Sequence, residues 1–590
     1  MPTPVPETVF EVLDRTANAH AARPAMRVKR GGNWQVTTWK EYRDQSRLAA
    51  RGFLRLGLQP RQGVVIMGYN RPEWFLADMG AIMAGGLPAG IYVTSTPEQC
   101  QYIADHAEAA IAVLENRQYL EGFLSIRDRL PNLKAIVLME GEHEAATSWN
   151  KLLELGQEVP ESDLQARLDA QKPEDVCTLI YTSGTTGPPK AVMLTHHNVT
   201  WTARRVAEAY GVNPDDDLIS YLPLSHIAEQ VVSLHSPMSM GGCSWFAESL
   251  EKLGENLREV RPHFFFAVPR VWEKMQAAIM AAGAQNPPLK KKISAWARGI
   301  GLEAGEAEQA GRSKPLFYGL ASKLVFSKVR ERLGLDRARV CATSTAPIAM
   351  DTLRFFISLG IPIMEVYGMS ECTGPATFSY PDRYRLGKVG VAIPGTEVKT
   401  AEDGEVMMRG PHVFPGYYKN EAATQETVDS EGWLHSGDIG ELDSDGFLKI
   451  TDRKKELLIT SGGKNIGPQN LESKLKQIPV VSQAVVVGDR RNYLAALITL
   501  DPLRAPLEGE ASGSQFRDPK DLAKCEVFRK HLEKQVEEIN NTLARYETIK
   551  RFAILPRELS IEEGELTPTL KLKRRVIYQN HADEIERLYA

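Results

Sequence analysis

A loop of hydroxyls and glycines that closes on a lysine has the clearest chemistry in this sequence. Residues 179–190 read LIYTSGTTGPPK, an apolar run followed by Ser, Thr and Gly residues and then Lys190. Glycines let the backbone approach an anion and point its N–H groups inward, while hydroxyls and a lysine add donors and charge. A flexible surface turn would not need all of these together, and the spacing does not fit GxxxxGK[ST]. We predict a phosphate-binding loop made of Thr182, Ser183, Gly184, Thr185, Thr186, Gly187 and Lys190.

Further motifs follow this loop in a fixed order: YLPLSHIAEQ (221–230), EVYGMSECTGP (365–375), GWLHSGDIG (432–440), DRKKELLITSGGKNIGP (452–468) and GELTPTLKLKRR (564–575). Together with the loop they resemble the motifs of the adenylate-forming superfamily, which includes acyl-CoA synthetases, luciferases and peptide-synthetase adenylation domains. One motif of this kind is a weak signal, but collinear motifs are a strong one. Within the superfamily, PLSHIAEQ, LKKKISAWARGIG, LVFSKVRERLGLD and TPTLKLKRR look like long-chain and very-long-chain acyl-CoA synthetases of the bubblegum type.

The resemblance implies a nucleotide site. Asp438 resembles the ligand of the ribose hydroxyls, since a carboxylate can accept from both, and Arg453 looks like its partner. Outside the motif, Asp438 would fit an Asx turn equally well. Tyr367 would offer a ring face to the base and Ser370 a hydroxyl to the α-phosphate. The implied floor of the adenine and ribose site is Glu365, Val366, Tyr367, Gly368, Met369 and Ser370.

Three more residues resemble catalytic positions of the family. Glu371 resembles the ligand of Mg²⁺, a hard cation that needs oxygen ligands and neutralises phosphate charge, although by itself it could be an exposed loop carboxylate. His226 would border the acyl pocket, although alone it would fit a packed core histidine. Lys571 would bridge the fatty carboxylate and the α-phosphate, where negative charge accumulates, although a basic solvated tail is its simpler reading.

The implied reaction has two steps: a fatty acid and ATP form acyl-AMP and pyrophosphate, and coenzyme A then displaces AMP to give acyl-CoA. ATP, Mg²⁺ and coenzyme A are the implied cosubstrates and cofactor. Because Lys571 would serve only the first step, the family rotates a small domain about a hinge, which here corresponds to Lys455. The implied coenzyme A side is Gly462, Gly463 and Lys464.

The sequence departs from the family pattern in the acyl region. Ala191 stands where glycine is usual, a small change that we expect to be tolerated. Thr343, Ser344 and Thr345 replace a run of smaller residues beside the adenine and acyl pocket, and Gln230 stands where some long-chain enzymes have a gating tryptophan. The preferred length of the fatty acyl chain is therefore left open. None of these departures removes a residue that would bind phosphate or metal.

The elements that must position these residues form an α/β pattern. Short apolar runs such as 63–69 and 134–140 predict buried strands, and helical patterns such as 72–86 lie between them. We expect mostly parallel sheets flanked by helices. Thr8 and Glu11 predict a capping box at the first helix. A stripe of apolar residues at helical spacing predicts a core-facing helix near the end of the chain: Phe528, Leu532, Val536, Ile539, Leu543 and Tyr546.

Length and a change in composition predict two parts. A chain of 590 residues is too long to fold around a single hydrophobic core. Gly- and Asp-rich turns near 440–455 mark the boundary, so we predict a large adenylation domain over 1–451 and a small mobile α+β domain over 452–590. The composition, with 43% hydrophobic and 25% charged residues, is that of a globular protein.

Net charge and cysteine usage restrict the classes of partner and the cellular compartment that we expect. A net charge of -4 gives no global attraction for nucleic acid. Scattered cysteines without a CxxC pair fit reduced thiols in the cytoplasm, and we expect neither a signal peptide nor a membrane span. Residues 289–337 carry eleven basic and five acidic residues with aromatics between them. This segment is either a solvated helical face or a peripheral patch for anionic lipid.

Two rival functions remain open at this level. One is another adenylate-forming reaction, such as loading of a carrier protein, which shares only the first step. The other is a non-catalytic protein that keeps the fold and binds lipid through 289–337. The presence together of Lys190, Glu371, Asp438, Arg453 and Lys571 argues against lost activity.

Overall fold

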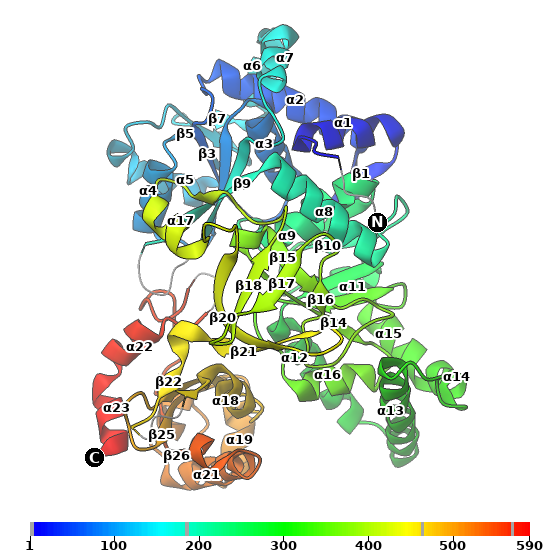
Figure 1. The fold of residues 1–590 in the computed structure, drawn as a ribbon, viewed down its shortest axis with the longest axis vertical. Coiled ribbons are helices and arrows are strands. Elements are labelled where there is room, and N and C mark those ends of the chain that lie inside the picture. Colours follow the sequence, from blue (N-terminus) through cyan, green and yellow to red (C-terminus); the bar gives the residue numbers. More distant parts are fainter. Residues whose placement is uncertain (1–4, 183–187, 462–464, 568–570) are drawn as a thin grey trace.

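The protein is described here from a computed structural model, which covers residues 5–182, 188–461, 465–567 and 571–590. Two large sheets with helices on both faces fill the upper and middle parts of the molecule, and a smaller sheet with its own helices lies below them near the C-terminus (Figure 1). The predicted α/β class with parallel-rich sheets is confirmed.

The first large sheet is parallel in its centre and antiparallel where it ends in the predicted phosphate loop. Strands β3, β4, β5, β6, β7 and β8 pair in parallel, while β9 pairs antiparallel with β8 and with β19. The strands in spatial order are β19 (Gly416–Tyr417), β9 (Lys190–Thr195), β8 (Val176–Thr182), β4 (Leu87–Ile91), β3 (Gly63–Met67), β5 (Ala109–Leu114), β6 (Ala135–Leu138) and β7 (Thr147–Ser148).

The second large sheet repeats this arrangement. Its central strands are parallel, and β2, β15 and β16 add antiparallel edges. In spatial order the strands are β16 (Val391–Ala392), β15 (Gly374–Phe378), β14 (Ile363–Met369), β13 (Val340–Thr343), β12 (Phe264–Ala267), β10 (Asp217–Ser220), β11 (Cys243–Phe246), β1 (Pro24–Arg30) and β2 (Asn33–Thr38). A separate antiparallel sheet contains β17 (Glu397–Thr400), β18 (Glu405–Arg409), β20 (Leu434–Leu442) and β21 (Leu448–Arg453).

Both faces of the large sheets are buried, as continuous apolar strands require. In β3, Val64 and Ile66 join one hydrophobic cluster while Val65 and Met67 join another. Each such side chain contributes about 1.5–3 kcal/mol on burial. The covering helices are α1 (Val9–Ala19), α2 (Trp39–Arg55), α3 (Pro72–Met83), α4 (Pro97–His106), α5 (Arg117–Leu124), α6 (Trp149–Glu158), α7 (Glu161–Asp169), α8 (His196–Tyr210), α11 (Leu253–Val260), α12 (Pro269–Ala284), α16 (Met350–Ile357) and α17 (Glu421–Thr427).

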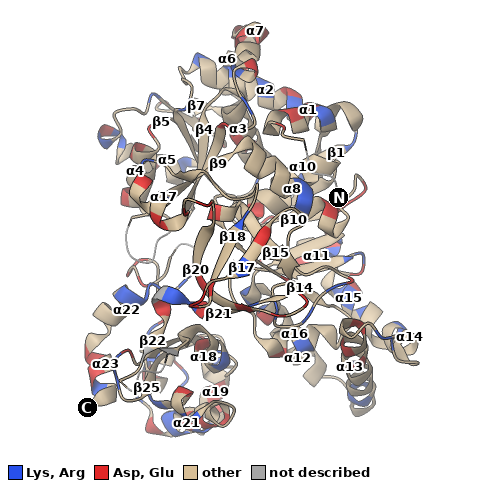
Figure 2. Cartoon of the chain, in the orientation of Figure 1, with Lys and Arg blue, Asp and Glu red and all other residues tan. Residues whose placement is uncertain are grey.

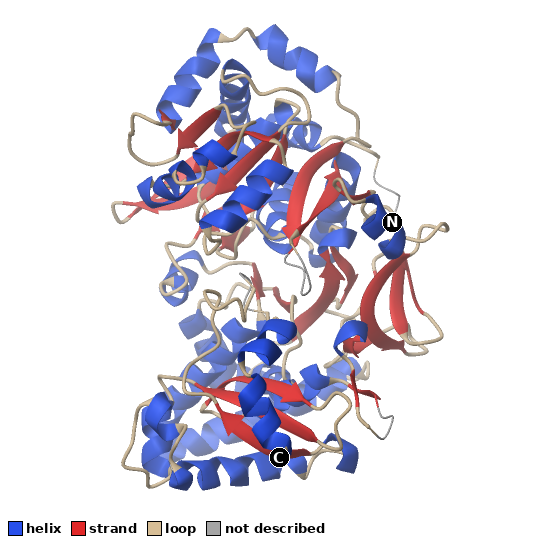
Figure 3. Cartoon of the chain, turned by 90° about the vertical axis from the view of Figure 1, so that its left-hand side faces the viewer, coloured by secondary structure: helices blue, strands red, loops and turns tan. Residues whose placement is uncertain are grey.

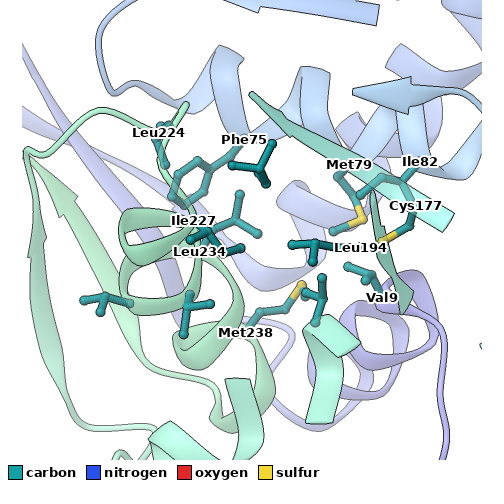
Figure 4. Packing of buried hydrophobic residues seen from close by; sticks show 14 of the residues in the cluster. Val9, Phe75, Met79, Ile82, Cys177, Leu194, Leu224, Ile227, Leu234 and Met238 are labelled. Carbon is teal, nitrogen blue, oxygen red and sulfur yellow. The ribbon is translucent and has the colours of Figure 1, made fainter. Parts of the chain in front are cut away.

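The central core ties together the elements that carry two predicted site residues. Figure 4 shows Phe75, Met79 and Ile82 of α3 packed with Leu194 of β9 and with Ile227 from the segment that follows His226. That segment continues as α9 (Ile227–Glu229), a π-helical turn over Gln230–His235, and α10 (Ser236–Met240). Lys190 and His226 are therefore held by one packed core.

The C-terminal elements form a smaller α+β unit. Strands β24 (Val481–Val487), β25 (Leu494–Leu500) and β26 (Ile549–Ile554) make its sheet, and a short pair, β22 (Leu458–Ile459) and β23 (Asn465–Ile466), precedes it. Alternate residues of β24 and β25 belong to two different hydrophobic clusters. Figure 3 shows the helices around this sheet near the C-terminus. The helices are α18 (Pro468–Leu475), α19 (Ala505–Ala511), α20 (Pro519–Leu522), α21 (Glu526–Asn540), α22 (Arg574–Asn580) and α23 (Ala582–Tyr589).

Two local predictions can be compared directly with the structure. The capping box is confirmed, because the Glu11 amide donates to Thr8 Oγ1 and the Glu11 carboxylate accepts from the Thr8 amide. The C-terminal stripe is correct for Phe528, Leu532 and Val536, which are buried, but wrong for Tyr546, which is 52% exposed. Helix α21 ends at Asn540, so the helical spacing no longer applies there.

The segment 289–337 is helical, as predicted. It contains α13 (Pro288–Gln309), α14 (Tyr318–Ala321), a π-helical turn over Ser322–Phe326 and α15 (Ser327–Leu333). In Figure 1, α13 and α14 protrude from the green part of the molecule. Among the described helices, none combines the length and the apolar character needed to cross a bilayer.

Candidate active site

Asp438, Arg453 and Tyr367 meet at the junction of two sheets. Asp438 of β20 lies opposite Arg453 of β21 in the antiparallel register. Arg453 Nε donates to Asp438 Oδ1 at 3.0 Å, and the Tyr367 hydroxyl donates to Asp438 Oδ2 at 2.8 Å. Figure 2 shows the acidic and basic segments along β20 and β21. The structure thus brings together three residues that lie far apart in the sequence.

Electrostatics favour the charged form of Arg453 and the neutral form of Tyr367. Burial opposes the charge of the Arg453 guanidinium, but the negative charges of Asp438 and Glu456 outweigh it and raise the pKa of Arg453. Burial, followed by the charge of Asp438, raises the pKa of Tyr367 well above its ordinary value. The phenol therefore remains a donor at neutral pH. A carboxylate fixed in this way can accept from a pair of neighbouring hydroxyls.

The rest of the predicted nucleotide floor lies on β14 and the 3-10 turn that follows it, Ser370–Cys372. Gly368 approaches the backbone so closely that a Cβ there would lie 1.8 Å from the Gly374 carbonyl oxygen, which explains the glycine. Val366 and Met369 are partly buried and Ser370 is buried.

Glu365 differs from the other floor residues. Its carboxyl is buried, and the Gly387 amide donates to Oε1 at 2.7 Å. Burial raises the pKa of Glu365 to about 8, so the side chain is largely neutral at pH 7. The side chain already serves a structural contact, and any contact with a nucleotide would come from its backbone.

Glu371 and Lys190 are linked through a residue that the motifs did not single out. The Tyr417 hydroxyl donates to Glu371 Oε1 at 2.7 Å, and Lys190 Nζ lies 4.6 Å from the centre of the Tyr417 ring. Burial and the charge of Glu371 raise the pKa of Tyr417. From the described residues, no hydrogen bond reaches the second oxygen of Glu371, Oε2.

The C-terminal segment brings Lys571 to the same place. Lys571 is exposed at its surface. Desolvation and then the positive charge of Arg453 lower the pKa of Lys571, while the charges of Asp438 and Glu371 raise it. The positive charge of Lys571 in turn contributes to lowering the pKa of His226. The Lys571 backbone amide donates to Thr567 Oγ1 at 3.0 Å. Predicted residues from five separate motifs therefore lie close enough for their charges to act on one another.

His226 lies on a segment fixed by a buried carboxyl. The Ala228 amide donates to His226 Nδ1 at 3.1 Å, and burial lowers the pKa of His226 to about 4, so the ring is neutral. Glu229 accepts from the hydroxyls of Ser220 and Ser233, both at 2.7 Å. Burial raises the pKa of Glu229 to about 7. A π-helical turn follows directly, a feature frequent at functional sites.

Some predicted residues lie outside the described part of the chain. In the phosphate loop these are Ser183, Gly184, Thr185, Thr186 and Gly187, and on the predicted coenzyme A side they are Gly462, Gly463 and Lys464. Thr182 closes β8 with its hydroxyl donating to the Lys190 carbonyl at 3.4 Å. The predicted hinge residue, Lys455, lies in the turn Lys454–Glu456.

Among the departures from the family pattern, Gln230, Thr343 and Ala191 are buried, while Ser344 and Thr345 are partly exposed. Gln230 Nε2 donates to the Leu224 carbonyl at 2.9 Å, so this side chain braces the segment around His226. Thr343 is buried at the end of β13, and Thr345 adopts a φ of 74°. Ala191 is buried between β8 and β19 and is accommodated without strain.

Two residues of this site, Tyr417 and Glu229, had no role assigned from the sequence. Glu229 lies inside the motif YLPLSHIAEQ. An acidic residue directly after the apolar Ile227 and Ala228 was the available signal. Tyr417 lies in the sequence GYYK, where only its spatial neighbours distinguish it from Tyr418.

Comparison with known proteins gives a consistent result. A model of the family described as "AMP-binding enzyme" matches residues 13–418, and one described as "AMP-binding enzyme C-terminal domain" matches residues 455–590. The long-chain-fatty-acid–CoA ligase ACSBG2 of Xenopus laevis is 42% identical, covering 99% of this chain and 84% of that protein. The human ACSBG2 is 37% identical, with 99% and 92% covered.

Solved structures with the same fold include an anthranilate CoA ligase, AuaEII, in complex with anthranoyl-AMP. It has a TM-score of 0.74 at 19% identity, covering 98% of this chain and 99% of that one. The O-succinylbenzoate coenzyme A synthetase of Bacillus subtilis, in complex with AMP, has a TM-score of 0.70 at 20% identity, with 96% and 98% covered. At these identities the likeness concerns the fold.

Proposed function

The chain belongs to the AMP-binding enzyme family, and on this premise we propose that it is a long-chain-fatty-acid–CoA ligase. A fatty carboxylate attacks the α-phosphorus of ATP, the bond to pyrophosphate breaks, and acyl-AMP forms. The thiol of coenzyme A then attacks the acyl carbon, loses its proton and displaces AMP. The observation that carries the proposal is the convergence of Lys571, Asp438, Arg453 and Glu371 at one site, where their charges act on each other. The fatty acid as substrate is supported by the curated relatives.

Each residue has a role that its surroundings support. Asp438 would accept from the ribose hydroxyls while Arg453 and Tyr367 hold its carboxylate in place. Lys190 and the hydroxyls of the phosphate loop would bind the triphosphate. Lys571 would stabilise the charge that develops between the fatty carboxylate and the α-phosphate. His226, neutral and partly fixed by the Ala228 amide, would border the acyl chain.

The residues present fit a magnesium ion. Glu371 is buried, one of its oxygens is held by Tyr417, and its other oxygen faces no donor from the described residues. A hard cation bound through phosphates needs only one or two carboxylates from the protein. When bound, Mg²⁺ would neutralise phosphate charge as pyrophosphate leaves. We therefore assign Glu371 as its protein ligand.

Two further assignments remain predictions. The chain would divide into 1–451 and 452–590, with a hinge at Lys455. Rotation about this hinge would bring Lys571 to the active site for adenylation and then remove it. Withdrawal would bring Gly462, Gly463 and Lys464 to the coenzyme A side. The charge interactions of Lys571 with Asp438 and Glu371 support an orientation that would serve the first step.

Pyrophosphate release tests the proposed function. With Mg²⁺ and ATP, we expect release that depends on a long-chain fatty acid and acyl-CoA that forms only when coenzyme A is added. A panel from medium to very long chains would then set the chain-length preference. If no fatty acid of the panel caused pyrophosphate release, the proposal would be contradicted. Acyl transfer to a carrier protein instead of coenzyme A would favour the other adenylate-forming reaction.

We further propose a cytoplasmic protein with peripheral membrane contact through 289–337. Apolar side chains are exposed beside lysines on α13 and on the turn that leads to α14. Leu316 is 92% and Phe317 53% exposed, and Lys290, Lys291 and Lys292 are also exposed. Exposed apolar side chains can enter the interface while each lysine near anionic lipid contributes about 1 kcal/mol.

Vesicle sedimentation measures this contact. We expect the protein to sediment with phosphatidylserine-containing vesicles, and we expect Phe317→Glu with Leu320→Glu to reduce the bound fraction about tenfold, since both changes add charge at an apolar contact. The matched control is Leu503→Glu with Leu507→Glu, two exposed leucines outside the segment. Equal binding by both double variants would exclude 289–337 as the contact, and a solvated helical face would remain.

A further inference from the structure

Tyr417 links two groups of the site that arrive from different parts of the chain. Its hydroxyl donates to Glu371 on the turn after β14, and its ring lies under the ammonium of Lys190 at the start of β9. The two contacts use different parts of one side chain. A hydrogen bond to a carboxylate fixes an oxygen in direction, while a ring face attracts a cation without fixing its direction.

The backbone around Tyr417 is firmly held. Strand β19 pairs antiparallel with β9, which places Tyr417 opposite Val192. The Tyr417 amide donates to Thr424 Oγ1 at 2.9 Å. Gly416 adopts a φ of 146°, and a Cβ there would lie 2.6 Å from the Thr424 side chain, so glycine is required before Tyr417. The side chain therefore enters the site from a rigid base.

Glu371 is tied to the same short segment by its backbone. The Phe414 amide donates to the Glu371 carbonyl at 2.9 Å, and the Phe414 ring packs edge-to-face on the Tyr417 ring at 4.9 Å. The segment 414–417 thus contacts Glu371 through both backbone and side chain. A tyrosine needed only for packing would have no reason to place its hydroxyl on a buried carboxylate.

We propose that Tyr417 is a positioning residue that prepares Glu371 and Lys190 for a magnesium-bound triphosphate. The hydroxyl occupies Glu371 Oε1 and leaves Oε2 for the metal. The ring holds the Lys190 ammonium until a phosphate competes for it. This inference rests on the proposed function, because it assigns a role toward the metal and the triphosphate of that reaction.

Binding of Mn²⁺ in place of Mg²⁺ tests the inference without catalysis. Electron paramagnetic resonance would measure free Mn²⁺ with the protein and α,β-methylene-ATP, an analogue that cannot form an adenylate. Hydrogen bonds to charged groups predict that Tyr417→Phe weakens Mn²⁺ binding about tenfold or more. We expect metal-free AMP affinity to stay unchanged. Tyr418→Phe, the neighbouring tyrosine, is the matched control and should bind Mn²⁺ like the wild type.

A double-mutant cycle separates positioning from a structural effect. If Tyr417 acts through Glu371, then Tyr417→Phe added to Glu371→Gln should cause no further loss of Mn²⁺ binding. Additive losses, or unchanged Mn²⁺ binding in Tyr417→Phe, would overturn the inference. Failure of the proposed function would appear separately, as absent fatty-acid-dependent pyrophosphate release in the wild type, since the binding assay contains no fatty acid.

Discussion

Replacing Lys571 by alanine should lower the rate of acyl-adenylate formation by about 10²–10³-fold, because it removes a fixed cation from the place where negative charge develops. The Lys571 backbone is held by hydrogen bonds with the Thr567 hydroxyl and amide, and the substitution leaves both in place, so the variant should fold normally. Pyrophosphate release from ATP and a long-chain fatty acid measures the first step. Thioester formation from supplied acyl-AMP and coenzyme A measures the second, which should be largely retained.

The neighbouring Lys573→Ala is the control for this prediction. Lys573 belongs to the same basic cluster, so a general loss of positive charge would affect both variants alike. If Lys571→Ala lost both half-reactions equally, or if Lys573→Ala had the same effect, the role assigned to Lys571 would be wrong. The simpler reading of a basic solvated tail would then be preferred.

Replacing Asp438 by alanine should weaken ATP binding about a hundredfold. The change removes the acceptor of the ribose hydroxyls and also leaves the Arg453 guanidinium and the Tyr367 hydroxyl without their carboxylate. Losing one partner of a fully buried ion pair costs about 3–5 kcal/mol. Asp438 is buried but the Arg453 side chain is 41% exposed, so solvent screens part of the uncompensated charge and the cost in stability is smaller here. Isothermal titration with ATP gives the affinity, and a thermal melt reports how much of the loss is stability.

Asp445→Ala is the matched control for this second variant. Asp445 lies in the turn between β20 and β21, where its side chain is 57% exposed and paired with Arg385. An exposed pair of this kind contributes about 0–1 kcal/mol, so ATP affinity should not change. Unchanged ATP affinity in Asp438→Ala would refute the assignment of Asp438 to the ribose.

Local signals in the sequence predicted local structure well. The capping box of Thr8 and Glu11 and the buried strand over Gly63–Met67 depend on residues close in sequence, and both are present. The stripe over Phe528 to Val536 is likewise buried, but the prediction extended too far. The Asn540 side chain donates a hydrogen bond to the Ile549 carbonyl and accepts one from the Ile549 amide. This contact joins α21 to β26, and the periodicity of one helix cannot predict it.

The candidate site was predictable as a set of motifs but not as a network. Resemblance placed Asp438 and Arg453 together, and the β20–β21 register shows how they meet. The link from Tyr417 to Glu371 spans 46 residues and depends on the pairing of β19 with β9, which no local pattern specifies. The neutral side chain of Glu365 was also not foreseen, since its pKa depends on burial that arises only in the fold.

The most direct test of acyl-adenylate formation follows the carboxylate oxygens of the fatty acid. A long-chain acid labelled with ¹⁸O in its carboxylate would be converted to acyl-CoA with ATP, Mg²⁺ and coenzyme A, and the products analysed by mass spectrometry. Because the thiol displaces AMP at the acyl carbon, the account predicts AMP that carries one ¹⁸O atom, with unlabelled pyrophosphate. Label in pyrophosphate, or AMP without label while acyl-CoA accumulates, would contradict it.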